Sequence, residues 1–468
     1  MADILLLQPP ISFTNHLANS GLDTYPIGLC YITAVLKKDG FSVRAINNSD
    51  AAYSISSLLD IIEAENVKIL GVSTLLATIP STVKLAKAVK DRFSDRIHVL
   101  MGNAYPSIDP EIIKRYPFFD AAVVGEAEGF VSEHCQSVLS GKKVTGIVTG
   151  NYPENLDAIP FPAYSSMENT IYHRGHLIPI IGTRGCPFQC GYCARQALSK
   201  KVRSRSSANI IAEMKERLHF TSAFYFQDDS ATIDRKHVID MCNAIIEEEM
   251  NVVFEMTTRL DLLDEEMIVS LKRAGCQRLI IGIESGNERI RNEIIRKNLS
   301  DDKIFKGMEL TKKCSMPVQL MFMLGHPEET PKEIMDSVNF PLKLDRMGFG
   351  NIEMVGYHLT IPIPGTRYFE WGIKNGIVSP SVLDDYINGK LGDGYFGHWP
   401  YLIPSGLTYH DMLEYRRLAT QSFHLRFKYI LKRAWMGVRS PKILWQDIKH
   451  GYYVIKQGTS SDISKTES

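Results

Sequence analysis

The chain has 468 residues, 44% of them hydrophobic and 23% charged, and its 53 basic residues balance its 53 acidic ones. This composition is typical of a globular protein of two or three domains. The zero net charge gives no support to a nucleic-acid partner, and eight cysteines in so long a chain exclude a disulfide scaffold.

The sequence contains no membrane span or secretion signal that we can recognise. No apolar run reaches the roughly 18 residues that a transmembrane helix needs. Asp3 stands where a signal peptide would carry a basic residue. We therefore expect a cytoplasmic protein, and clustered cysteines in that reducing compartment indicate metal binding or catalysis.

The first 150 residues alternate short apolar strands with amphipathic helices. This alternation predicts a parallel, doubly wound, flavodoxin-like sheet, which binds ligands beyond the carboxyl ends of its strands. The expected strands cover 3–8, 41–46, 68–74, 98–103 and 121–126. Small or polar residues at these ends are candidate ligand contacts: Ser73, Thr74, Leu75, Gly102, Asn103, Gly125 and Glu126.

A second α/β unit is expected over 177–370, after a proline-rich linker over 151–176. Six strand–helix units follow one another there, which predicts a (βα)6 partial barrel of the TIM type. Its strands are expected at 178–183, 223–229, 252–259, 278–285, 318–325 and 351–359. Residues 371–468 are expected to be mainly helical, with a disordered tail after Gln457.

Three cysteines lie within eight residues, in a loop that follows the first strand of the second unit. Cys186, Cys190 and Cys193 stand in "GTRGCPFQCGYCARQ", whose glycines, proline and arginines are not typical of a protein core. The loop thus lies on the catalytic face of the expected barrel. Three thiolates would hold an iron–sulfur cluster with one iron left open for chemistry. Structural zinc and three packing cysteines are the alternatives, although no second cysteine pair completes a zinc module.

The C-x-x-x-C-x-x-C pattern, with an aromatic residue before its last cysteine, resembles the radical S-adenosylmethionine (SAM) superfamily. The resemblance implies a 4Fe–4S cluster held by these three cysteines, with SAM bound at the open iron and cleaved to a 5′-deoxyadenosyl radical.

The resemblance also implies SAM-binding positions. Glu284 in "GIESG" would bind the ribose, and Arg259 would pair the SAM carboxylate. A surface glutamate and a barrel-mouth ion pair are the structural alternatives. The full set is Phe188, Tyr192, Asp228, Asp229, Arg259, Glu284, Met323 and Gly325.

The N-terminal unit resembles the cobalamin-binding domain that precedes many radical SAM barrels. The order of "QPP", "GVSTL" and "VVGEAEGF" carries this resemblance, with Ser73 and Gly102 at the expected nucleotide tail. Two positions depart from the pattern, since Asn103 replaces a glycine and Tyr25 stands where a cobalt-ligating histidine would be. Cobalamin would then bind without a protein ligand below cobalt.

Together these resemblances identify the chain as a cobalamin-dependent radical SAM enzyme. We expect it to methylate an unactivated carbon or phosphorus of a small-molecule or lipid-like substrate, with flavodoxin or ferredoxin as electron donor. A cyclase, oxidoreductase or rearrangement enzyme with the same domains is the alternative, and a non-catalytic metal-bearing scaffold is a third. The basic, aromatic segment 411–457 favours a helix packed on the barrel by its apolar face, with peripheral membrane contact as the alternative.

Overall fold

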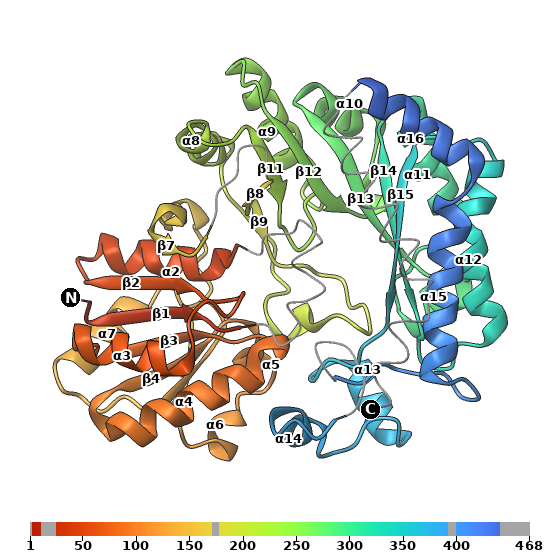
Figure 1. The fold of residues 1–468 in the computed structure, drawn as a ribbon. Helices are drawn as coiled ribbons and strands as arrows, with labels where there is room; N and C mark the ends of the chain where they lie inside the picture. Colours follow the sequence, from red (N-terminus) through yellow and green to blue (C-terminus); the bar gives the residue numbers. More distant parts are fainter. Residues whose placement is uncertain (1, 11–24, 171–176, 392–398, 440–468) are drawn as a thin grey trace.

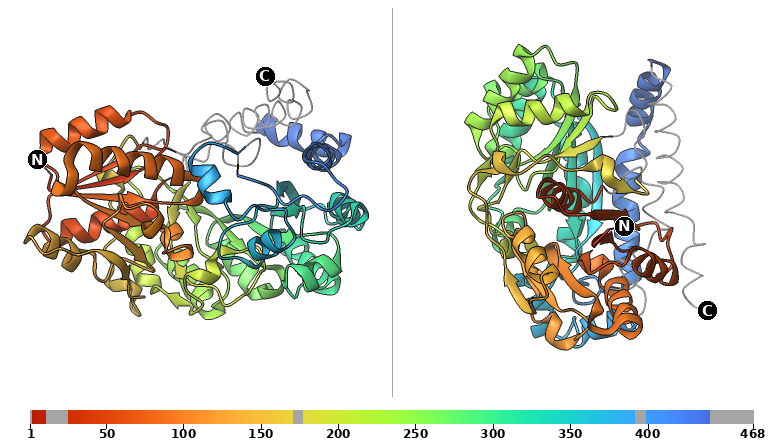
Figure 2. Two further views of the ribbon diagram at one scale, coloured as in Figure 1. Left: turned by 90° about the horizontal axis from the view of Figure 1, so that it is seen from below. Right: turned by 90° about the vertical axis from the view of Figure 1, so that its left-hand side faces the viewer.

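The computed structural model describes residues 2–10, 25–170, 177–391 and 399–439. Figure 1 shows two α/β units side by side, the first in red and orange and the second in green and cyan, and Figure 2 shows them from two further sides. The expected α/β architecture with a helical C-terminal part is therefore confirmed.

The first unit is built on a seven-stranded parallel sheet in the order β6-β5-β4-β3-β1-β2-β7. Its central part, β2-β1-β3-β4-β5, has the flavodoxin-like strand order that the sequence predicts. The short strand β7 lies in the stretch expected to be a linker and pairs with β2. The strands are β1 (Ile4–Gln8), β2 (Val43–Asn47), β3 (Ile69–Ser73), β4 (His98–Gly102), β5 (Ala121–Val124), β6 (Gly146–Thr149) and β7 (Met167–Glu168).

Helices cover both faces of this sheet because successive side chains of a strand point to opposite faces. Ile4 and Leu6 pack in the core that includes α2 and α7, whereas Leu5 and Leu7 pack in the core that includes α3 and α4. The helices are α2 (Ile27–Lys38), α3 (Ile55–Glu65), α4 (Ile79–Phe93), α5 (Ala104–Ile108), α6 (Ile112–Arg115) and α7 (Val131–Leu139).

The second unit contains six parallel strands that follow one another in chain order, β8-β11-β12-β13-β14-β15. Among the described residues β8 and β15 do not pair, so the sheet is an open, partial barrel. In β14, Val318 and Leu320 are buried, while Met321 and Met323 are half-buried on the alternate face. The strands are β8 (Ile178–Ile180), β11 (Ala223–Phe226), β12 (Val253–Thr258), β13 (Cys276–Glu284), β14 (Val318–Leu324) and β15 (Ile352–Leu359).

Helices follow the strands of this sheet and begin at side-chain caps. The Thr330 hydroxyl accepts from the Glu333 N–H while the Glu333 carboxylate accepts from the Thr330 N–H, which is a capping box. The helices are α8 (Ser207–Arg217), α9 (Arg235–Glu247), α10 (Glu265–Arg273), α11 (Asp301–Lys313) and α12 (Pro331–Arg346).

The C-terminal part is helical, as expected, and α15 packs against β15 and α12. Its helices are α13 (Arg367–Lys374), α14 (Val382–Ile387), α15 (Tyr409–His424) and α16 (Phe427–Arg439). The tail after Gln457 that we expect to be disordered lies outside the described residues. None of the described helices is both long and apolar enough to cross a bilayer.

Candidate active site

The cysteine loop leaves the carboxyl end of β8 and is held by a two-stranded ribbon, β9 (Thr183–Arg184) with β10 (Arg203–Ser204). Gly185 has a φ of +98°, and a Cβ there would lie 2.1 Å from the Lys201 carbonyl oxygen. Only glycine fits this close approach. The backbone therefore turns sharply just before Cys186, whose N–H donates to the Ser199 carbonyl over 3.2 Å.

Two aspartates at the end of β11 hold this loop in place. Asp228 accepts from the Gly182 N–H over 2.7 Å and from both the N–H and the hydroxyl of Thr183 over 3.0 Å. Burial raises the pKa of Asp228 to about 7, although these bonds act in the opposite direction. Asp229 accepts from the Gly185 N–H over 2.9 Å and pairs with Arg195. Both aspartates are predicted SAM contacts, and both are hydrogen-bonded to the chain itself.

Cationic groups surround the three thiols. Burial raises the pKa of each thiol, to about 11 for Cys193, while Arg259, Lys297 and Arg195 lower one or more of these values. The thiols are close enough to influence one another's pKa. Three grouped, partly buried thiols with nearby cations fit a thiolate-bound cluster, because the cations oppose the effect of burial and a bound metal would itself keep the thiols deprotonated.

The same thiols do not form the ligand set of a single ion. Within the described ranges no three His, Cys, Asp or Glu side chains are arranged to hold one metal ion. A cubane spreads its thiolates over different irons and does not need that convergence. Three thiolates on one loop are the donor set that the radical SAM resemblance implies for a 4Fe–4S cluster with one open iron.

Glu284 lies at the end of β13 in a strained conformation. Its φ is +71°, and the β13–β14 register shifts between Gly282 and Glu284. Tyr192, from the cysteine loop, and Lys297 each donate to Oε1 over 2.8 Å. Burial alone raises the pKa of Glu284, but Lys297 and these two hydrogen bonds hold it below its usual value. The carboxylate is therefore charged, and Oε2 accepts from no described residue.

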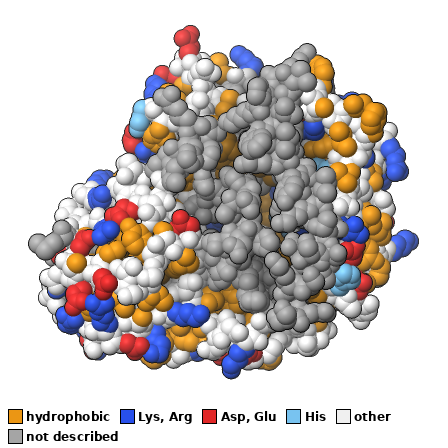
Figure 3. Space-filling model, viewed as in Figure 1, with side chains coloured by type: hydrophobic (Ala, Val, Ile, Leu, Met, Phe, Trp, Pro, Cys, Tyr) orange, Lys and Arg blue, Asp and Glu red, His pale blue; other side chains and the backbone are white. Residues whose placement is uncertain are grey.

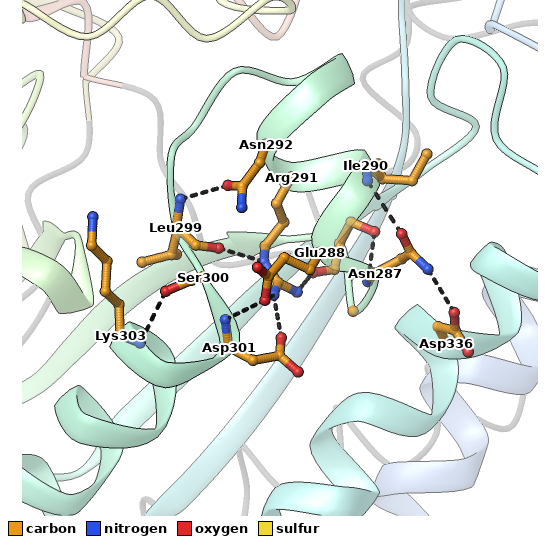
Figure 4. A network of polar contacts seen from close by, with 12 residues as sticks. Asn287, Glu288, Ile290, Arg291, Asn292, Leu299, Ser300, Asp301, Lys303 and Asp336 are labelled. Carbon is orange, nitrogen blue, oxygen red and sulfur yellow. Dashed lines mark hydrogen bonds and ion pairs between the residues drawn. The ribbon is translucent and has the colours of Figure 1, made fainter.

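The segment that supplies Lys297 is fixed by a buried arginine (Figure 4). Arg291 donates to the Ser285 and Leu299 carbonyls over 2.8 Å and pairs with Asp301. Arg291 follows the first residue of a π-helical turn, Ile290–Ile294, a feature frequent at functional sites. This network holds both ends of the loop between Glu284 and α11.

Arg259, for which we predicted a SAM contact, is held by other groups of the chain. Its guanidinium makes two hydrogen bonds of 2.9 Å to the Asp261 carboxylate and a third, of 2.7 Å, to the Lys297 carbonyl. It also lies 3.9 Å over the ring of Phe188 in the cysteine loop. The barrel-mouth ion pair that we named as the alternative is therefore present, and Arg259 braces the loop through Phe188.

A cavity of about 250 Å³ opens beside Glu284. Gly325, after β14, has a φ of +89°, and a Cβ there would lie 2.6 Å from the Leu402 carbonyl oxygen. The N–H groups of Gly325 and His326 both donate to Glu329. Apart from Tyr192, Glu284 and His358, the lining of the cavity is apolar: Met321, Phe322, Met323, Leu359 and Ile361.

Sequence reasoning missed three residues of this site. Lys297 and Glu329 lie in loops whose local patterns carry no signal for them, and His326 is buried against the Tyr368 hydroxyl, 2.9 Å from its Nδ1. Burial lowers the pKa of His326 to about 4, so its imidazole is neutral. A histidine directly after the fifth-strand glycine was the only available clue.

Small residues line the carboxyl edge of the first sheet, where we predicted cobalamin contacts. Ser73 is buried and accepts from the Asn103 amide over 2.8 Å. Gly102 has nothing within 4 Å of the position of a Cβ, which leaves room for a ligand at close range. The Thr74 hydroxyl donates to the Val72 carbonyl, and the Gly125 N–H donates to the Ser107 hydroxyl. Leu75 follows Thr74 at the same edge of the sheet. An edge lined by small residues fits a broad, flat cofactor.

Glu126 binds the second unit through ion pairs. Arg184 lies 2.8 Å from both Glu126 and Glu128, and Arg203 also pairs with Glu126. Glu126 is also a predicted cobalamin contact, and both its carboxylate oxygens accept hydrogen bonds from arginines. Because Arg184 stands two residues before Cys186, these pairs connect the carboxyl edge of the first sheet to the cysteine loop.

Comparison with known proteins agrees with the sites described in both α/β units. Residues 180–340 match the radical SAM superfamily, and residues 16–133 match the B12 binding domain. The chain is a cobalamin-dependent radical SAM enzyme. Its radical SAM domain implies a 4Fe–4S cluster and SAM, and its B12-binding domain implies cobalamin.

Relatives of this enzyme include methyltransferases and a cyclase. It is 25% identical to an uncharacterized methyltransferase of Pyrococcus horikoshii over 98% of this chain and 97% of that protein. It is 23% identical to cytidylyl-2-hydroxyethylphosphonate methyltransferase of Streptomyces wedmorensis, covering 81% and 83% of the two chains. It is also 23% identical to an anaerobic magnesium-protoporphyrin IX monomethyl ester cyclase of Rubrivivax gelatinosus, over 74% and 66%.

The fold is also similar to a solved structure. The radical SAM methyltransferase TsrM of Kitasatospora setae, solved with cobalamin and a [4Fe-4S] cluster bound, superposes with a TM-score of 0.67 over 90% of this chain and 91% of that one. The two sequences are 14% identical, so the likeness is one of fold.

Proposed function

We propose that this enzyme transfers a methyl group to an unactivated carbon or phosphorus of a small-molecule or lipid-like substrate. The observation that carries the proposal is the set of ion pairs from Arg184 to Glu126 and Glu128. They connect the expected cobalamin edge to the cysteine loop, as a reaction that uses both cofactors requires. Methyltransferases among the relatives support the same outcome.

When bound, the cofactors would supply the difficult chemistry: the cluster would provide the electron for SAM cleavage, and cobalamin would carry the methyl group. The chain holds and orients them. Cys186, Cys190 and Cys193 would hold the cluster, and Glu284 would accept hydrogen bonds from the SAM ribose through Oε2. The apolar wall of β14 and β15 would keep water from the reacting carbon.

The ribose role is testable by SAM binding to the cluster-loaded enzyme. Glu284→Gln keeps the shape of the side chain but removes the charge, and a hydrogen bond to a charged group contributes about 1.5–3 kcal/mol. Affinity measured by calorimetry should fall roughly ten- to a hundredfold. Glu247→Gln, on an exposed turn of α9, is the matched control and should change nothing. Unchanged affinity with an intact cluster would remove this role from Glu284.

Product analysis separates methyl transfer from the second candidate. A cyclase, oxidoreductase or rearrangement enzyme with the same domains is favoured by the magnesium-protoporphyrin cyclase among the relatives. Anaerobic enzyme reconstituted with cobalamin, SAM and a flavodoxin or ferredoxin as electron donor should give both 5′-deoxyadenosine and S-adenosylhomocysteine. Formation of 5′-deoxyadenosine alone would favour the second candidate.

A further inference from the structure

Helix α16 presents its apolar side chains to solvent. Phe427, Trp435 and Leu431 are the three most exposed large hydrophobic residues in the described part of the chain, at 76, 59 and 52%. Ile430 is also exposed. At about 100° per residue these four side chains fall within an arc of roughly 140° on one side of the helix. Figure 3 shows hydrophobic side chains gathered at the upper right, over this helix.

The opposite face of α16 holds the helix to the second unit. Tyr429 is buried and donates to the Glu353 carbonyl of β15 over 3.0 Å, and Lys432 donates to the Gly350 carbonyl over 2.9 Å. Tyr429 also packs against Phe423 and His424 of α15. The helix is packed on the sheet as predicted, but the prediction is wrong about the face: Tyr429 and Lys432 contact the second unit, while most of the apolar side chains of α16 point outward.

Basic residues border the exposed apolar face on both sides: at about 100° per residue, Lys428 lies next to Trp435 and Arg433 follows Ile430 around the helix, whereas Lys432 is on the packed face. Residues 427–439 contain four Lys or Arg and no Asp or Glu. The Lys428 side chain is 77% exposed, and its only described ionic partner, Asp345 at 3.7 Å, is already paired with Arg426 at 2.7 Å. An apolar arc containing Phe and Trp between basic flanks is the pattern of a helix that lies in the plane of an anionic membrane surface.

We propose that α16 docks the enzyme on an anionic lipid bilayer, with Phe427 and Trp435 inserted and Lys428 at the headgroups. The basic residues beside the apolar face of α16 complement the negative charge of the lipid headgroups. The proposed contact of α16 with the bilayer is peripheral, as none of the described helices is long and apolar enough to span a bilayer. Tyr429 fixes α16 to β15, whose His358 and Leu359 line the cavity. An apolar substrate drawn from the membrane would then lie close to the site. That last step rests on the proposed function, whereas docking does not.

Vesicle co-sedimentation of the full-length, anaerobically purified enzyme tests the docking. Phosphatidylcholine vesicles that contain phosphatidylserine should bind it, and raised salt should weaken binding because surface charges are screened. Phe427→Ser with Trp435→Ser should lower the partition coefficient at least tenfold. Leu218→Ser, which removes an exposed leucine after α8, should leave it unchanged. No binding to the anionic vesicles, or an equal loss in both variants, would overturn the proposal.

Two further measurements separate a lipid surface from other occupants of this face. Each Lys or Arg near an anionic surface changes partition about fivefold, so Lys428→Glu should weaken binding at least that much, while the similarly exposed Lys236→Glu should not. Brominated lipid should quench tryptophan fluorescence, and Trp435→Phe should remove most of the quenching. A lipid-free dimer that the Phe427→Ser and Trp435→Ser changes dissociate would assign the face to a second copy and overturn lipid docking.

Discussion

Glu329 is a buried carboxyl whose charge the protein disfavours. Its Oε2 accepts from the N–H groups of Gly325 over 2.7 Å and His326 over 3.0 Å, while its buried Oε1 has no partner among the described residues. Burial raises its pKa from 4.5 to about 8, and the two hydrogen bonds offset only part of this effect. We predict that Glu329→Gln removes a pH-dependent loss of stability.

The direction of this pH effect on stability follows from whether Glu329 is protonated in the folded and in the unfolded chain. Below pH 4.5 both states carry the proton, so the side chain contributes no pH dependence there. Between that pH and about 8 the unfolded chain releases the proton while the folded chain keeps it, so stability falls as the pH rises. At about 1.4 kcal/mol per pH unit, the wild-type protein should lose roughly 3 kcal/mol between about pH 5 and pH 7.

Glutamine keeps the oxygen that accepts from both N–H groups but cannot ionise. The free energy of unfolding, measured in urea by tryptophan fluorescence, should therefore shift in favour of Glu329→Gln by about 3 kcal/mol across that pH range. Other groups titrate equally in both proteins and cancel in the difference. Glu328→Gln, at the exposed neighbour, should show no such shift. A difference between wild type and Glu329→Gln that stays constant with pH would refute the reasoning.

Two substitutions and one spectroscopic measurement test the two cofactor-binding edges. Cys186→Ala should abolish the iron–sulfur absorption band because two thiolates do not retain the cluster, whereas Cys135→Ala, in a buried packing position, should preserve it. Arg184→Met leaves the Glu128 carboxylate without its cation and should destabilise the protein by about 3 kcal/mol, seen as unfolding at a lower urea concentration. An unchanged unfolding midpoint would contradict this role of the ion pair. Electron spin resonance of reduced, bound cobalamin should lack nitrogen splitting, because Tyr25 stands where a histidine would; splitting would contradict this.

The sheets were predictable because their patterns are local. In "ILLL", residues 4–7, every residue is apolar, as in a strand covered on both faces, and the structure buries Leu5 and Leu6 in different cores. The cysteine spacing is local too, and so is the position of Glu284 at the end of a strand. Each of these features lies within a few residues of chain, where periodicity and turn residues carry the information.

Partners across the chain were not predictable. Asp228, Arg259 and Glu126 have the residue types of ligand contacts, yet all three bind other parts of the protein. Which partner a charged side chain takes depends on loops that pack together only in the folded chain. The same limit applies to α16, whose sequence shows an amphipathic helix without showing which face touches the sheet.

The strain at Glu284 shows how these long-range contacts determine the site. A non-glycine residue at φ +71° within a strand is unfavourable and persists only where its surroundings hold it. Here Tyr192 from the cysteine loop and Lys297 from the loop held by Arg291 both bind its carboxylate. The Gly191 N–H donates to the Ile295 carbonyl over 2.7 Å, so the two loops also fix each other. The position of the cysteine loop and the direction of the Glu284 carboxylate are therefore set together, by contacts within the chain.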